Sequence, residues 1–378
     1  MRVLFVSRAF PPVIGGIEQQ NADLARFLGH ECELTLIANR KGKRFLPLFF
    51  PWALFRTLML LPKYDVLLLG DGVLAPVGAI AKLFFPKKTV VSVVHGLDLT
   101  FAEKAGLLSR VYRCFHVPAL RMLDGLICVS QETKRVALSL GISDTRAFVI
   151  PNGIHPEAFV QTPEYTREAL AALLKKDLTG KKVILRLGRF VEHKGVEWFI
   201  RNVVPKLSED VLFVAAGGVA KKGIPGDMSF FPRCEGAVEE LGLSERVILL
   251  TNIPSSDVQL LLHTADLAVA PNIPVAGTME GFGISVLEAS ISHLPIIVAR
   301  LEGLQEAVTD GENGVFAKPG DADDFLTKIN AFLTDDQKRR DFGERSSRYT
   351  REHYHWNTLS KRYIELLEDF MKSVTNTH

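Results

Sequence analysis

Residues 280–288, Glu-Gly-Phe-Gly-Ile-Ser-Val-Leu-Glu, constrain the chemistry of this chain more than any other stretch. From Ile284 onward, apolar residues recur at spacings of three and four, which indicates a helix. We therefore expect Glu280 on the loop that enters this helix and Glu288 inside its second turn. A glycine-rich helix start leaves backbone N–H groups unpaired, and the helix dipole favours an anion there.

The two glutamates add a second requirement to that anion site. A carboxylate on the loop and another along the helix can each accept hydrogen bonds from a cluster of hydroxyl groups. A ligand with hydroxyls on both sides of an anion matches this pattern, and a nucleotide sugar, with its ribose, diphosphate and hexose, is such a ligand. The alternative is a solvated helix face that follows a tight turn.

A second candidate anion site follows a predicted strand at residues 183–188. Arg189 comes directly after this strand, and Lys194 precedes the next predicted helix. An arginine offers a planar fork of donors and a lysine a movable point charge, so the pair suits a diphosphate. Two exposed loop cations are the alternative.

The first half of the chain starts with an apolar strand at residues 2–7, and Gly15 and Gly16 lie before a helical run. These glycines would let a ligand approach the backbone closely. The dinucleotide-binding fingerprint G-x-G-x-x-G is absent from this loop, which disfavours a dehydrogenase. A further strand at residues 89–94 ends at His95, and ligands of open α/β sheets bind at such strand ends.

These motifs resemble, in the same order along nearly the whole chain, those of the retaining family 4 glycosyltransferases of the GT-B fold, including phosphatidylinositol mannoside mannosyltransferases. The resemblance implies an α/β protein of two Rossmann-like domains, with parallel sheets facing across a cleft. It implies a first, acceptor-binding domain at residues 1–165, joined by a C-terminal helix at about 357–378 that crosses back to it. Residues 166–356 would form the domain that binds the nucleotide-sugar donor.

The resemblance also implies roles for single residues. The implied catalytic residues are His95, Glu280, Arg189 and Lys194. The implied donor-binding residues are Gly15, Gly16, Arg189, Lys194, Asn252, Ile253, Glu280, Gly281, Phe282, Gly283, Ile284 and Glu288. Asp98 is the acceptor candidate. His95 as a satisfied core histidine and Asp98 as a structural residue stay open as alternatives.

The activity implied is transfer of a hexosyl group from a nucleoside diphosphate sugar to a hydroxyl of a glycan or lipid-linked acceptor in envelope or exopolysaccharide synthesis. The alternatives are a GT-B epimerase and a non-catalytic nucleotide-sugar binding protein. The resemblance leaves UDP-, GDP- and ADP-sugars unseparated. No cofactor or metal is expected, because the cations and helix starts take the place of a metal at the diphosphate.

The length of 378 residues suggests two domains, and the four cysteines are scattered as in a reduced, cytoplasmic protein. Residues 1–160 hold 19 basic and 12 acidic residues, whereas the remainder holds 26 and 31. A basic first half would favour an anionic acceptor or peripheral contact with the inner face of a membrane, although an ordinary solvated surface is an equal alternative. No basic run is interleaved with stacking aromatic residues, so nucleic acid is not an expected partner.

Residues 45–62 are conspicuously apolar, but Arg56 and internal prolines interrupt them. The run falls short of the roughly 18–20 apolar residues of a spanning helix. We favour a buried helix that packs on the sheet. An interfacial segment that meets lipid or a lipid-linked acceptor is the alternative.

Overall fold

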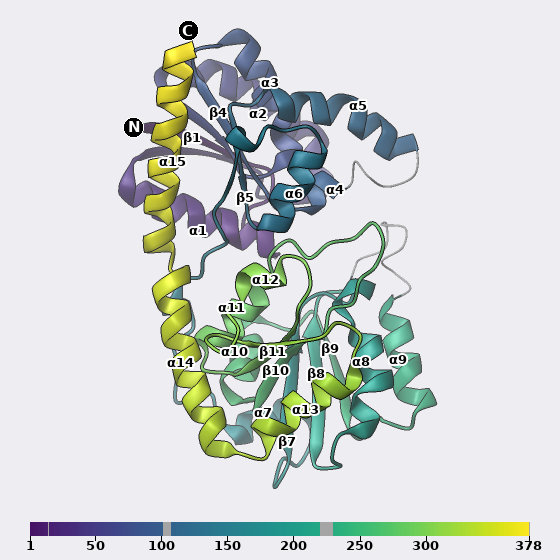
Figure 1. Ribbon diagram of the computed structural model, residues 1–378. Helices are drawn as coiled ribbons and strands as arrows, with labels where there is room; N and C mark the ends of the chain where they lie inside the picture. Colours follow the sequence, from purple (N-terminus) through teal and green to yellow (C-terminus); the bar gives the residue numbers. More distant parts are fainter. Residues whose placement is uncertain (14, 101–106, 220–229, 378) are drawn as a thin grey trace. The chain divides into compact units, whose positions relative to one another are not determined.

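The computed structural model describes residues 1–13, 15–100, 107–219 and 230–377 (Figure 1). The chain divides into two compact units. The first contains Met1–His155, Gly277–Phe282 and Tyr354–His378, and the second contains Pro156–Ala276 and Gly283–His353. The division after His155 comes earlier than the boundary we expected near residue 165. It also places the short segment with Glu280 in the first unit and the helix with Glu288 in the second.

Within the described residues, the first unit is built on a six-stranded parallel sheet in the order β2-β1-β3-β4-β5-β6. Its strands are β1 (Arg2–Ser7), β2 (Glu33–Ala38), β3 (Val66–Leu69), β4 (Thr89–Val94), β5 (Gly125–Cys128) and β6 (Ala147–Val149). All residues of β3, β4 and β5 are buried, as expected for parallel strands covered on both faces. The chain runs from β1 outward to β2 and then returns to β3, so the strand order reverses between β1 and β3.

Helices cover both faces of this sheet. They are α1 (Gly16–Glu31), α2 (Leu46–Leu60), α3 (Ala75–Phe84), α4 (Leu97–Thr100), α5 (Leu107–Met122), α6 (Gln131–Ser139) and α15 (Trp356–Thr377). Residues of α2, α3, α5 and α6 share one apolar core with the strands, whereas α15 packs beside α1 (Figure 1). The C-terminal helix therefore belongs to the first unit, as the sequence indicated.

The expectation of a buried helix at residues 45–62 is wrong in part. A helix, α2, is present, and Phe49, Ala53 and Thr57 on one face of it are buried. Its opposite face leaves large apolar side chains in solvent, among them Leu48 and Phe55. Composition alone could not separate these two faces, because both carry large apolar side chains.

The second unit is built on a parallel sheet that has, among the described residues, six strands in the order β12-β11-β10-β7-β8-β9. These are β7 (Lys182–Leu187), β8 (Val211–Gly217), β9 (Val247–Thr251), β10 (Leu267–Ala270), β11 (Ile296–Ala299) and β12 (Val315–Ala317). The chain moves from β7 to β9 in one direction and from β10 to β12 in the other. The strand order therefore reverses between β7 and β10.

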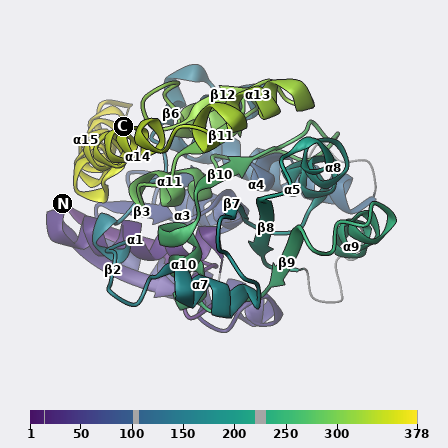
Figure 2. The ribbon, with the colours of Figure 1, turned by 90° about the horizontal axis from the view of Figure 1, so that it is seen from below.

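The helices of the second unit lie on both faces of its sheet, with α8 and α9 on one face and α7 and α10 on the other (Figure 2). The helices are α7 (Arg167–Leu174), α8 (Val196–Asn202), α9 (Phe230–Glu240), α10 (Ser255–Thr264), α11 (Ile284–Ile291), α12 (Leu304–Ala307), α13 (Ala322–Leu333) and α14 (Asp336–Tyr354). The glycines and prolines of residues 221–232 predict a loop. Most of them lie outside the described residues, and α9 already begins at Phe230.

Candidate active site

The loops after β7 and β10 meet at the point where the strand order of the second sheet reverses. In open α/β sheets this point leaves a crevice in which ligands bind. The backbone N–H of Ile273 donates to the carbonyl of His193 at 3.0 Å, which joins the two loops. A Cβ at Gly195 would lie 1.8 Å from the carbonyl oxygen of Pro271. Gly195 also has φ of +71°, so both its conformation and its close contact require glycine.

Lys194 and Glu288 come from these two sides of the switch point. Lys194 is half-buried in a short 3₁₀ turn, Glu192–Lys194, that precedes α8. Glu288 lies in the second turn of α11, as predicted. Burial raises the pKa of Glu288 from an ordinary 4.5 to about 7, and the positive charge of Lys194 opposes that rise. The two groups therefore interact electrostatically within one site.

The buried guanidinium of Arg186 holds the loop that carries Arg189. Gly188 follows β7 with φ of +126°, and a Cβ on Gly217 at the end of β8 would lie 1.9 Å from the Gly188 carbonyl oxygen. The guanidinium of Arg186, which is 1% exposed, donates to the carbonyls of Gly188 and Arg189. The Arg189 side chain itself is exposed at the carboxyl end of the sheet.

The helix α11 begins at the place where we expected a helix start that binds an anion. Gly283 caps the helix in the left-handed conformation with φ of +90°, and no side chain caps it. A Cβ at Gly283 would lie 2.5 Å from Leu304, and Ile284 opens the helix, half-buried. The first N–H groups of α11 are consequently not taken by a capping side chain.

Residues 280–282 belong to the first unit and contact the loop after β4. A Cβ at Gly281 would lie 2.1 Å from the carbonyl oxygen of His95, so only glycine permits this approach. Phe282 is 2% exposed and packs against Tyr354, with ring centroids 6.1 Å apart. Its ring is therefore part of the core, which leaves only its backbone for a donor. Glu280 is half-buried beside Gly281.

His95 is held at the end of β4 by backbone contacts. Its Nε2 lies 3.0 Å from the carbonyl oxygen of Gly70, and its own N–H donates to the carboxylate of Asp98 at 3.0 Å. Asp98 also accepts from the N–H of Gly72 at 2.8 Å and is 6% exposed. The observed contacts of Asp98 thus fix two loops, and its acceptor role stays a prediction.

A buried ion pair occupies the switch point of the first sheet. The Nε of Arg8, after β1, donates to the carboxylate of Asp71, after β3, at 2.9 Å. Asp71 is completely buried, and burial raises the pKa of its carboxyl while Arg8 opposes the rise. Sequence reasoning missed both residues; the signal was a charge directly after each of two apolar strands.

Gly15 and Gly16 lie at the start of α1, as predicted. No side-chain hydrogen bond caps this helix, and the carboxylate of Glu18 folds back over Gly15. An anion that bound here would therefore be repelled by the negative charge of Glu18.

Asn252 and Ile253 follow β9 at the same edge of the second sheet. Asn252 has φ of +52°, is exposed, and donates its backbone N–H to the carbonyl of Gly217 at 3.0 Å. Ile253 is half-buried. The strand order places these two residues beyond β8 from the switch point, where the far end of an extended ligand would reach.

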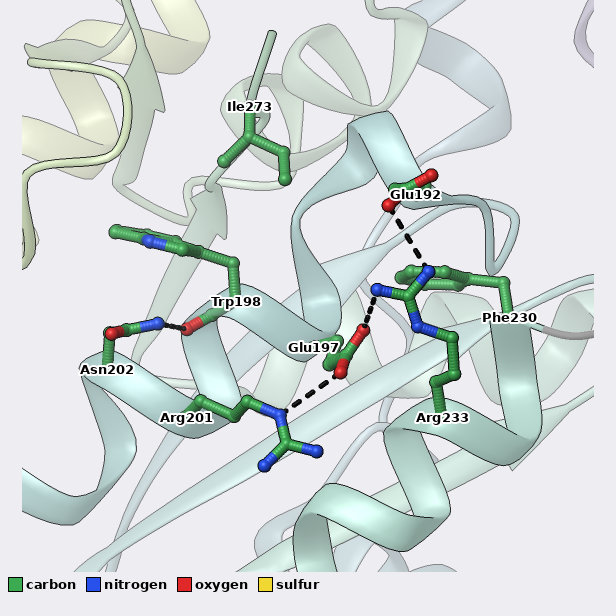
Figure 3. Close-up of a pocket in the computed structure, with 8 residues that line it drawn as sticks. All are labelled: Glu192, Glu197, Trp198, Arg201, Asn202, Phe230, Arg233 and Ile273. Atoms are coloured by element: carbon green, nitrogen blue, oxygen red, sulfur yellow. Dashed lines mark hydrogen bonds and ion pairs between the residues drawn. The ribbon is translucent and has the colours of Figure 1, made fainter. Parts of the chain in front are cut away.

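A cavity of about 190 Å³ lies beside the turn that carries Lys194 (Figure 3). Arg233 of α9 bridges Glu192 of that turn at 3.2 Å and Glu197 of α8 at 2.7 Å. Arg201 pairs with the same Glu197 at 3.1 Å (Figure 3). These ion pairs tie the turn to two helices, and sequence reasoning missed Arg233 because its partners lie 41 and 36 positions away.

Within the described residues, no group of three or more histidine, cysteine, aspartate or glutamate side chains is arranged to hold a metal ion. Among the described residues near the switch point of the second unit are the charged side chains of Arg189, Lys194 and Glu288. The arrangement can therefore bind a dianion with hydroxyl groups beside it.

Two family models match the chain in succession. A model described as Glycosyltransferase Family 4 matches residues 14–158, and one described as Glycosyl transferases group 1 matches residues 173–349. Together they span most of both units. The chain belongs to the glycosyltransferases that these two models describe. Its Gly-Arg, Lys-Gly and two-glutamate motifs all lie in the part that the group 1 model matches.

Curated relatives agree with this assignment. The chain is 26% identical to the GDP-mannose-dependent alpha-(1-6)-phosphatidylinositol monomannoside mannosyltransferase of Mycolicibacterium smegmatis, with 97% of this chain and 98% of the relative covered. It is 27% identical to a Campylobacter jejuni N-acetylgalactosaminyltransferase named for its N,N'-diacetylbacillosaminyl-diphospho-undecaprenol acceptor, with 75% and 71% covered.

Solved structures show the GT-B fold that the sequence predicted. The HepE protein of Anabaena, solved with UDP-glucose, superposes with a TM-score of 0.76 at 20% identity, covering 98% of this chain and all of that one. The catalytic domain of starch synthase IV from Arabidopsis thaliana, bound to ADP and acarbose, superposes with a TM-score of 0.78 at 16% identity, covering 98% and 99%.

Proposed function

We propose that this glycosyltransferase moves a hexosyl group from a nucleoside diphosphate sugar to a hydroxyl of a lipid-linked or glycan acceptor, with retention of anomeric configuration. The observation that carries the proposal is that Lys194, before α8, and Glu288, in α11, both lie at the switch point of the second sheet, where a backbone hydrogen bond joins the loops after β7 and β10. A cation and an acidic group at one crevice suit a ligand that is anionic in one part and rich in hydroxyls in another. Names of relatives support the acceptor class, since two of them act on phosphatidylinositol mannoside or on a diphospho-undecaprenol.

The diphosphate would lie between Arg189, Lys194 and the start of α11. Cleavage of the glycosidic C–O bond leaves negative charge on the departing diphosphate oxygen. Cations and oriented N–H groups that already point at that oxygen stabilise the charge without reorganising. Removal of one such donor typically costs about 10²–10³ in rate.

Glu288 would accept hydrogen bonds from the ribose hydroxyls, and Glu280 from the transferred sugar. A carboxylate forms stronger hydrogen bonds than a neutral group, so each pair would add specificity for a sugar hydroxyl at a fixed place. Asn252 and Ile253 would lie at the base. His95 would lie near the reacting carbon, held in place by Gly70 and by Asp98.

Retention would follow from attack of the acceptor hydroxyl on the same face that the diphosphate leaves. The acceptor proton then passes to the departing diphosphate oxygen, so the attack needs no carboxylate as nucleophile. No metal is required in this scheme, because Arg189, Lys194 and the helix start supply the positive charge. We further propose that the enzyme works in the cytoplasm, at the inner face of the membrane that holds its acceptor.

The test is turnover of UDP-, GDP- and ADP-sugars with and without lipid extracts as acceptor source, in buffer that contains EDTA. The proposal expects one donor to be consumed, with release of the nucleoside diphosphate. It also expects a product that NMR shows to have the donor's anomeric configuration. An inverted product would overturn retention. Interconversion of the sugars without release of nucleoside diphosphate would indicate an epimerase, and binding without turnover would indicate a scaffold.

A further inference from the structure

The helix α2 exposes a continuous apolar stripe. Leu48, Trp52, Phe55 and Met59 are 64%, 48%, 61% and 56% exposed. Their spacings of four, three and four place them on one face of the helix. Isolated apolar side chains on a surface need no explanation, but four large ones in a row on one helix indicate a surface that another apolar phase covers.

The opposite face of α2 is anchored in the protein. Phe49 is 1% exposed and Ala53 is not exposed, and both belong to the core that α2 shares with α3 and the first sheet. Residues Lys43–Lys63 form one helical run that is long and apolar enough to cross a membrane by composition, yet 22% of its most apolar window is buried inside the protein. A spanning orientation would pull Phe49 and Ala53 out of the core. The helix can instead lie along a surface with only its stripe inserted.

The charged residues on α2 and beside it in the sequence are all basic. Between Glu33 and Asp65 the sequence has no acidic residue. In this interval, six basic residues flank or interrupt the apolar run, namely Arg40, Lys41, Lys43, Arg44, Arg56 and Lys63. Each is exposed. Juxtaposed apolar and basic side chains fit a bilayer of anionic lipids, whose headgroups attract the cations while the stripe enters the acyl boundary.

A groove continues this surface at the N-terminal end of α2. It has a volume of about 550 Å³ and lies between the end of β2 and the helix. Phe45, Leu48 and Trp52 line it, together with Arg40 and Lys41. The ammonium of Lys41 lies 4.6 Å from the centre of the Phe45 ring, so a cation is held at the groove over an aromatic face. A lipid phosphate beside an acyl chain matches both parts of this groove.

We propose that the exposed face of α2 docks the enzyme on an anionic phospholipid bilayer, with the helix in the plane of the membrane surface. The anionic lipid covers the stripe and fills the groove. The inference rests on the proposed function, because docking would bring the first unit to a lipid-linked acceptor. It is tested separately from catalysis, since binding to vesicles needs no turnover.

The experiment is co-sedimentation of the full-length protein with vesicles of phosphatidylcholine alone or with about 30 mol% phosphatidylglycerol, which carries the negative charge. The variant Phe55→Gln/Met59→Gln removes half of the stripe and leaves Trp52 as a fluorescent reporter. The matched control is Val160→Gln/Leu241→Gln, because these exposed apolar residues, 60% and 42% exposed, lie in the second unit.

The expected result is binding to the anionic vesicles that falls about ten-fold or more in the α2 variant and is unchanged in the control, because two buried apolar side chains are lost from the interface. Fluorescence of the protein should shift to the blue on binding, and rising salt should weaken binding. Donor hydrolysis in solution should be equal in all three proteins. If the wild type hydrolyses no donor, that result counts against the proposed function. Binding to vesicles still tests the docking proposal.

Three outcomes would overturn the proposal. The wild type could fail to sediment with anionic vesicles, or the α2 variant could sediment as well as the wild type. Binding could also be absent while the wild type forms a concentration-dependent dimer that the α2 variant abolishes. That third result would assign the stripe to self-association.

Discussion

Burial raises the pKa of the Glu288 carboxyl, and the positive charge of Lys194 opposes that rise. The pKa of Glu288 rises from 4.5 to about 7, so between these values the folded protein binds more protons than the unfolded chain. The contribution of this group to stability therefore falls as the pH rises from about 4.5 to 7. The full loss is on the order of 3 kcal/mol.

Glu288→Gln should remove this loss. Without donor, the variant should gain stability over the wild type at pH 8 and show little difference at pH 4.5, as measured by thermal unfolding across that pH range. Affinity for nucleoside diphosphate should fall about ten-fold or more, because a charged acceptor of ribose hydroxyls is gone. Glu239→Gln, at an exposed position on α9, serves as the control. Identical pH profiles for wild type and Glu288→Gln would contradict the assignment.

Lys194→Ala should lower turnover about 10²–10³-fold while the protein still folds, since the lost charge faces the departing diphosphate. It should also raise the pKa of Glu288 further, because Lys194 opposes that rise. Steady-state kinetics check the first effect, and the pH dependence of unfolding checks the second. Lys318→Ala, at an exposed lysine of the same unit, should change neither. Full activity in Lys194→Ala would refute the diphosphate assignment.

The positions of single candidate residues could be predicted where residue type and local pattern coincide. The places of Glu288, Arg189 and Lys194 beside a strand or helix agree with the prediction, whereas their roles stay predictions. Arg186 could not be assigned in this way, because a cation inside an apolar strand finds its partners, the carbonyls of Gly188 and Arg189, only after the loop folds back. Nothing in local spacing fixes such a contact.

At the scale of elements, two loops approach each other closely at the switch point of the second sheet. Gly195 after β7 meets the carbonyl of Pro271 after β10. Any side chain at residue 195 must displace that backbone and also adopt a positive φ. The loop geometry around Lys194 therefore depends on the glycine that directly follows it.

Gly195→Ala should cost about 3 kcal/mol or more, since it adds a backbone clash to the cost of the left-handed conformation. Gly180→Ala is the matched control, because Gly180 has φ of +67° but no atom within 4 Å of an added Cβ. It should cost only about 1–2 kcal/mol, the penalty of the conformation alone. Denaturant unfolding measures both. Equal losses in the two variants would show that the loop can move aside.

Element types could be predicted well, but exposure could not. Strands such as residues 89–94 have nearly continuous apolar sequences that indicate burial on both faces, and β4 is buried throughout. The apolar run at residues 45–62 gave the same signal, yet one face of α2 lies in solvent. Apolar composition reports that a surface avoids water, and it does not report whether protein or lipid covers it.

At the scale of the whole molecule, both units repeat one arrangement. Each has a parallel sheet whose strand order reverses next to its first strand, and each places charged residues there: Arg8 and Asp71 in the first unit, Arg189 and Lys194 in the second. Asp71 is fully buried and accepts a hydrogen bond from the partly buried Arg8, whereas Arg189 is exposed. The guanidinium of Arg189 at the second switch point is therefore accessible to a ligand, whereas the carboxylate of Asp71 at the first is not.

The order of motifs predicted the fold of the whole chain, because each motif marks a strand end in one of two repeated sheets. The exact division between the units could not be predicted. Residues 280–282 join the first unit through the contact of Gly281 with His95, which links positions 186 residues apart. Sequence spacing carries no information about such a contact.

The most direct test of the whole account is a crystal structure of the enzyme with its nucleoside diphosphate sugar. The account predicts that the two phosphates lie within hydrogen-bonding distance of Arg189, Lys194 and the first N–H groups of α11, with the ribose at Glu288. Phosphates that bind elsewhere on the protein, with Arg189 and Lys194 left in solvent, would contradict it.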